Sequence, residues 1–115
     1  MKNILFAFLL LIPLSNSLAQ QQSDSLVARA FQNAEKGIFW MLSNIPENKT
    51  RFGHDLISED RLISTVRLDV EINGVKIESR GFENTTEVSI KIYRSVNNLM
   101  KEGYLKNKKL KQPGE

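Results

Sequence analysis

The chain contains a single histidine, His54, which is the natural starting point for any chemistry. Asp55 follows it directly, and Glu59 and Asp60 come shortly after. An imidazole beside a carboxylate can move protons near neutral pH, and both groups are common zinc ligands. A lone histidine has no second imidazole at helical spacing, however, and acidic residues in a polar segment are usually solvated. His54 with Asp55 is therefore kept as an alternative, a small hydrolase or a metal-dependent enzyme, and we predict no bound metal or cofactor.

Other residue types that carry catalysis lack the settings that activate them. The chain has no cysteine, which excludes thiol chemistry. Its serines do not occur in the Gly-x-Ser-x-Gly pattern of a nucleophile elbow. The glycines lie at positions 37, 53, 74, 81, 103 and 114, too scattered to form one phosphate-binding loop. This composition favours a protein that acts by binding.

Residues 1–19 have the pattern of a cleavable export signal. Lys2 provides the positive charge, residues 4–12 form an unbroken apolar run, and small residues at Ser17 and Ala19 suit a signal peptidase that cleaves after Ala19. A membrane anchor needs about 20 apolar residues, and this run is about half that length. Without cysteine, a lipid-modified N-terminus is also excluded. We predict a secreted or periplasmic protein with no transmembrane segment in its mature chain.

Removing 19 of the 115 residues leaves 96, enough for one domain, which we assign to residues 20–105. Only Lys2 of the 16 basic residues is lost, so 15 basic residues face 13 acidic ones. This mild excess and the predicted export both argue against a nucleic-acid partner.

Residues 106–115 are predicted to form a basic, flexible tail. Four lysines fall in it, opposed only by Glu115: Lys106, Lys108, Lys109 and Lys111. The tail is either simply solvated or in contact with an anionic envelope surface or an acidic partner.

Residues 24–44 are predicted to form a long helix that ends before Pro46. Its apolar side chains recur at three- and four-residue steps, as Val27, Phe31, Ala34, Ile38 and Ile45 show. Gly37 lies inside this helix, which lowers helix propensity and indicates a close backbone approach.

Phe39 and Trp40 do not follow this apolar stripe. At 100° per residue they lie about 100° and 160° from Ile38 around the helix axis. Either the strands wrap far enough round the helix to cover them, or they form an exposed aromatic pair that contacts a partner or a second copy.

A hairpin is predicted over residues 62–72 and 75–81. Apolar and polar residues alternate on both sides of Asn73-Gly74, the pair typical of a two-residue type I′ turn. This turn predicts that Ile72 pairs with Val75, Val70 with Ile77 and Leu68 with Ser79. Residues 46–61 are polar and interrupted by Pro46 and Gly53, and we predict a long loop there. A connection of this length is either functional or partly ordered by its own apolar residues, Phe52, Leu56 and Ile57.

Residues 86–93 fit two structures. Val88, Ile90 and Ile92 alternate as in a third strand, which would lead into a short helix at about 94–102. Alternatively, Asn84-Thr85-Thr86-Glu87 resembles a capping box that starts a longer helix. Ile90 and the β-branched composition favour the strand.

Together these elements predict an α+β domain: a long N-terminal helix packed on a small antiparallel sheet, with a short C-terminal helix. The arrangement resembles the cystatin and NTF2-type architectures in fold only, because no motif of either family is present. The predicted function is that of a small exported, non-enzymatic binding protein, inhibitor-like or an accessory subunit, whose partner is another protein or a second copy.

Overall fold

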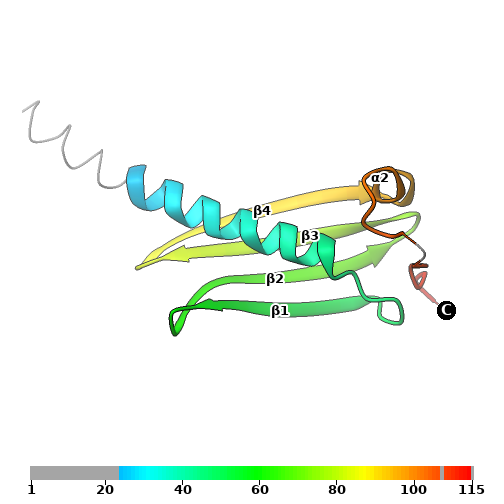
Figure 1. Ribbon diagram of the computed structural model, residues 1–115, viewed down its shortest axis with the longest axis horizontal. Helices are drawn as coiled ribbons and strands as arrows, with labels where there is room; N and C mark the ends of the chain where they lie inside the picture. Colours follow the sequence, from blue (N-terminus) through cyan, green and yellow to red (C-terminus); the bar gives the residue numbers. More distant parts are fainter. Residues whose placement is uncertain (1–23, 107, 115) are drawn as a thin grey trace, which may run out of the picture.

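In the computed structural model, which describes residues 24–106 and 108–114, one long helix packs across an antiparallel sheet of four strands (Figure 1). The N-terminal helix covers residues 24–43, and the strands follow it in the spatial order β1-β2-β3-β4. Their bounds are β1 Arg51–Ser58, β2 Arg61–Glu71, β3 Gly74–Glu83 and β4 Thr86–Ser95, and helix α2 is Val96–Lys101. The predicted signal peptide lies outside the described residues.

The predicted α+β fold is confirmed, including the third strand of the prediction and the short C-terminal helix. The alternative of a longer helix from residue 84 is wrong. Asn84 has a positive φ of 54° and lies in the turn between β3 and β4. The helix begins only after Ser95, whose side chain accepts a hydrogen bond of 3.1 Å from the Asn98 N–H.

The long loop predicted over residues 46–61 is wrong, because β1 occupies half of it and contains its apolar residues Phe52, Leu56 and Ile57. Within the described residues β1 is an edge strand with β2 as its one neighbour, and only its helix face is partly buried. A polar composition is compatible with such a strand. A register shift between Leu56 and Ile57 also interrupts the alternation by which a strand is recognised in the sequence.

The predicted hairpin is present, but its register differs from the prediction. Val70 pairs with Val75 and Leu68 with Ile77. The displacement is by two residues, so each side chain stays on its predicted face. Asn73 has a positive φ of 61°, whereas Gly74 begins β3. A Cβ at Gly74 would lie 2.5 Å from the Arg94 carbonyl oxygen, so the close approach of β4 requires glycine here.

The N-terminal helix touches the sheet through very small side chains. A Cβ at Gly37 would collide with the hydroxyls of Ser64 and Ser79, which are buried and hydrogen-bonded to each other at 3.0 Å. A Cβ at Gly81 would collide with the backbone of Ala30 and Ala34. Gly37 therefore does mark a close approach, as the sequence indicates. We call these six residues, Ala30, Ala34, Gly37, Ser64, Ser79 and Gly81, the small-residue seam.

Larger apolar side chains fill the core beyond this seam, toward the C-terminal end of the helix. They come from the helix, the two central strands and the C-terminal segment: Ile38, Met41, Leu42, Ile45, Val66, Leu68, Val70, Val75, Ile77, Leu99, Leu105 and Leu110. Within the described part of the chain, no helix is both long enough and apolar enough to cross a membrane.

Candidate functional site

Trp40 is the centre of an aromatic cluster beside the edge strand β1. Its ring stacks on the His54 ring with 3.7 Å between the centroids and an angle of 4° between the planes. The Phe52 ring lies 6.2 Å from Trp40 at 24°, and the ammonium group of Lys49 lies 5.1 Å from the Phe52 centroid. Trp40 and Phe52 are half-buried, whereas His54 is exposed. We call Trp40, Phe52 and His54 the aromatic platform.

The local geometry of β1 explains how these rings meet. Phe52 pairs with Leu68 and His54 with Val66, and both partners are buried beneath the helix. Alternate residues of a strand point to the same face, so Phe52 and His54 both lie on the helix face. Sequence reasoning singled out Trp40 and His54 separately and missed Phe52. The alternation of Phe52, His54 and Leu56 is the signal that could have found it.

The structure does not bring His54 and Asp55 together. As neighbours in a strand they point to opposite faces of the sheet, with His54 on the platform and Asp55 on the face away from the helix. The described residues also contain no group of three or more histidine or acidic side chains placed to hold a metal. The arrangement of these two residues therefore offers no paired acid and base.

Phe39 and Trp40 are in different environments. Phe52 and His54 of β1 cover part of Trp40, so neither predicted outcome, cover for both rings or an exposed pair, holds for the two residues together. Phe39 is 58% exposed. Phe39 therefore remains accessible to a partner, whereas Trp40 exposes only part of its side chain. A contact surface that includes both residues is smaller than one made by two exposed rings.

The outer edge of β1 has free backbone groups at every second residue. Val70 donates a hydrogen bond of 2.8 Å to the Thr50 carbonyl, which places residues 50, 52 and 54 in the ladder with β2. Arg51, Gly53 and Asp55 consequently direct their N–H and C=O groups away from the sheet. Among residues 24–106 and 108–114, no strand pairs with this side of β1.

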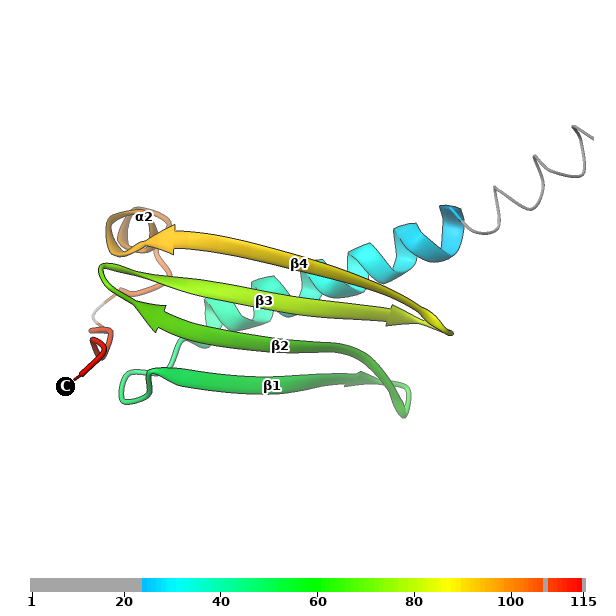
Figure 2. The same ribbon diagram turned by 180° about the vertical axis from the view of Figure 1, so that it is seen from behind.

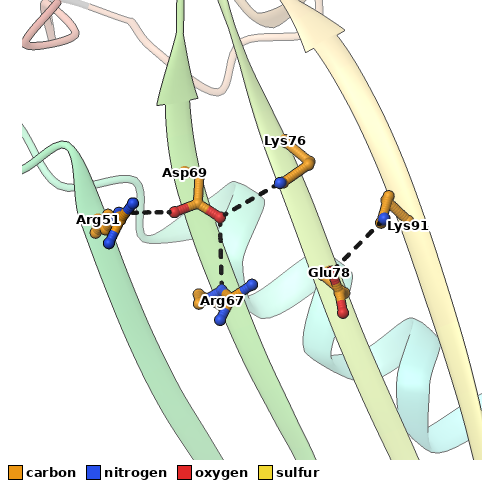
Figure 3. A network of polar contacts seen from close by, with 6 residues as sticks. All are labelled: Arg51, Arg67, Asp69, Lys76, Glu78 and Lys91. Atoms are coloured by element: carbon orange, nitrogen blue, oxygen red, sulfur yellow. Dashed lines mark ion pairs between the residues drawn. The ribbon is translucent and has the colours of Figure 1, made fainter. Parts of the chain in front are cut away.

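The face of the sheet opposite the helix carries charged side chains and, in the described part of the chain, is not covered by a helix (Figure 2). Figure 3 shows three cations directed at one carboxylate: Arg51 and Arg67 lie 3.5 Å from Asp69, and Lys76 lies 3.8 Å from it. Lys91 pairs with Glu78 at 3.9 Å in the same view.

Asp69 and its three cations line a hollow of about 590 Å³, together with Pro113 and Gly114 of the C-terminal segment. Glu71 also lines it, so basic and acidic groups alternate in the hollow. The positive charges are compensated within the face, and the arrangement is that of a solvated charged surface.

The predicted basic tail is held to the domain at several points. Leu110 is buried in the core, and Lys108 donates to the Ile45 carbonyl at 3.5 Å. The side-chain oxygen of Gln112 accepts a hydrogen bond of 3.4 Å from the Asn73 N–H. Lys106 and Lys109 are exposed, and Lys111 is half-buried. This segment therefore packs against the turn between β2 and β3.

Comparison with known proteins gives no relative for this chain. Its sequence matches no protein-family model and no curated protein, and its fold matches no solved structure.

Proposed function

We propose that this protein is an exported, non-enzymatic binding protein that takes up an extended segment of a protein partner as a fifth strand on the free edge of β1. The observation that carries the proposal is the coincidence of free backbone groups at Arg51, Gly53 and Asp55 with the aromatic platform on the same strand. The backbone groups supply hydrogen bonds for the added strand, and the aromatic platform supplies apolar contact area.

The edge of β1 lacks several features that prevent strand addition. Edge strands are commonly protected by lysine, proline or a bulge. β1 contains neither lysine nor proline, and its irregularity lies at Leu56 and Ile57, beyond the platform. The open stretch is therefore residues 51–55.

The chemistry of the edge defines the segment that it would bind. Side chains of an added strand on the helix face would lie beside Phe52 and His54, so we expect apolar or aromatic residues at alternate positions. On the opposite face they would lie beside Arg51 and Asp55, which favours polar or charged residues. A segment with this alternation is the proposed ligand class.

Export accords with this role, because the partner would be met in the periplasm or outside the cell. We expect the mature protein to begin at Gln20, and mass spectrometry of the exported protein tests this. An exported protein that retains residues 1–19 would contradict the predicted cleavage.

The binding proposal is tested with a proline at the edge of β1. In Asp55→Pro the missing N–H faces outward, so the ladder with β2 is kept while strand addition is blocked. Asp55→Ala is the matched control, because it removes the same carboxylate but keeps the N–H. Wild-type protein and both variants are immobilised and exposed to envelope extract of the source cells.

We expect one protein to be retained by the wild type and by Asp55→Ala, and to be lost with Asp55→Pro. We also expect its binding to change the fluorescence of Trp40, the only tryptophan, because the added strand lies beside that ring. Equal retention by all three proteins, or no specific retention at all, would refute the proposal.

A further inference from the structure

The opposite edge of the sheet, formed by β4, has a different pattern of free backbone groups. Val96 donates to the Asn73 carbonyl at 2.9 Å, and residues 88, 90 and 92 therefore pair with β3. Glu87, Ser89, Lys91 and Tyr93 consequently direct their N–H and C=O groups outward. No strand within the described ranges pairs with this side of β4.

The free stretch of β4 is closed at one end by an arginine. The Arg94 guanidinium donates a hydrogen bond of 3.2 Å to the Tyr93 carbonyl, one of the outward-facing groups. Arg94 is itself held 3.9 Å from Glu102 of the C-terminal segment. The open positions that remain are Glu87, Ser89 and Lys91, and Ser89 is their centre.

The charges on this stretch are complementary about its centre. Glu87 and Lys91 lie two residues to either side of Ser89 and carry opposite charges. If a second copy pairs antiparallel with Ser89 opposite Ser89, each Glu87 lies opposite the other copy's Lys91, and opposite charges at paired positions stabilise a sheet. Within one copy, Glu87 pairs with Arg80 at 2.7 Å and Lys91 pairs with Glu78 at 3.9 Å. In the dimer, these exposed ion pairs would connect with those of the second copy across the interface.

The N-terminal helix also extends over the space that an added strand would fill. Its first turns pass beyond β4 on the side away from β3 (Figures 1 and 2). Two apolar residues of these turns, Val27 and Phe31, are 46% and 45% exposed. Phe31 lies about 180° from Trp40 around the helix axis, and so on the flank opposite β1. An added strand would cover these side chains.

We infer that two copies of this chain pair through β4 about a two-fold axis at Ser89, which joins the two sheets into one continuous antiparallel sheet. The same edge serves on both copies, as a two-fold interface requires. The helix of each copy then covers apolar residues of the other copy's β4, because Val88 lies opposite Ile90 in this register. This interface lies at the edge opposite the proposed partner site on β1 and is independent of it.

The inference is tested by measuring the mass of the purified protein in solution by sedimentation. We expect a dimer for the wild type and a monomer for Ser89→Pro, which lacks an outward N–H but keeps the ladder with β3. Ser89→Ala is the matched control and is expected to remain dimeric. Circular dichroism of each variant confirms that the fold is retained. Asp55→Pro at the other edge is expected to leave the dimer intact, so a failure here is distinct from a failure of the binding proposal.

The register is tested by charge reversal. Glu87→Lys and Lys91→Glu each place like charges opposite one another twice, and we expect the dissociation constant of the dimer to rise about tenfold or more. When the two variants are mixed, opposite charges face each other at both positions, and a heterodimer is expected. A monomeric wild type, a dimer that survives Ser89→Pro, or charge-reversed variants that fail to recombine would each overturn the inference.

Discussion

Replacing Gly81 with alanine is expected to separate the helix from the sheet. The added methyl group would lie 2.9 Å from the Ala34 Cα and would collide with the Ala30 carbonyl oxygen and the Ala34 nitrogen. All three are backbone atoms, so no side chain can rotate away. Ordinary contact begins at 3.4 Å, and the tightest of the three contacts decides the displacement, so the helix must move by about one ångström or more.

The cost follows from what this movement disturbs. Overpacking a core costs about 1–3 kcal/mol. The partly buried hydrogen bond from Asn33 to the Phe82 carbonyl, at 2.7 Å, lies next to the collision and contributes about 1 kcal/mol. The lower chain entropy of alanine in the unfolded state offsets about 0.4–1 kcal/mol. We expect a net loss of about 1–3.5 kcal/mol from a total stability of about 5–14 kcal/mol for a domain of this size.

Urea unfolding followed by Trp40 fluorescence measures the effect. With a denaturant dependence of about 2 kcal/mol per molar, the midpoint is expected to fall by about 0.5–2 M. Gly53→Ala is the control, because its added methyl group would meet only the Val66 carbonyl oxygen, at an ordinary distance of 3.7 Å. If both variants have the same midpoint, the helix does not touch the sheet at Gly81 and the small-residue seam is not as described.

Three further substitutions test the packing by the same urea assay. Asn33→Ala leaves the Phe82 carbonyl without its hydrogen bond and is expected to cost about 1–3 kcal/mol, whereas an unchanged midpoint would show that water replaces the amide. Leu110→Ala is expected to cost about 2 kcal/mol or more because Leu110 is 5% exposed, and a neutral result would mean that the C-terminal segment is not packed on the core. Ile72→Thr is expected to change stability by less than about 0.5 kcal/mol because Ile72 is 82% exposed in the turn; a large loss would instead support the register in which Ile72 pairs with Val75.

The hairpin illustrates how much of this fold can be predicted from the sequence. Alternation of apolar and polar residues identifies both strands and assigns each side chain to the correct face. The register depends on the turn, and the sequence Asn73-Gly74 predicts two positions with positive φ. Only Asn73 uses that conformation, whereas Gly74 is required by its distance to Arg94. A contact with a later strand cannot be recognised from the turn sequence.

The candidate site was predictable only in part, for a similar reason. The position of Trp40 away from the apolar stripe indicated an unusual environment. The rings that stack on Trp40 belong to β1. That strand is not predicted from the sequence, because an edge strand buries few side chains and so lacks most of the apolar alternation by which a strand is recognised. Which backbone groups of β1 and β4 face outward depends on the pairing of the strands, and side-chain patterns do not contain that information.

The small-residue seam also limits how this protein can diverge in evolution. Ala30, Ala34 and Gly37 on the helix face Ser64, Ser79 and Gly81 on the sheet; all six are buried, and an added Cβ would collide at both glycines. A larger side chain at one position therefore requires a smaller side chain at the position that faces it. These positions are expected to vary together or not at all. Distant relatives with little overall identity are expected to keep small residues at these six positions, and a search for that spacing is a way to find them.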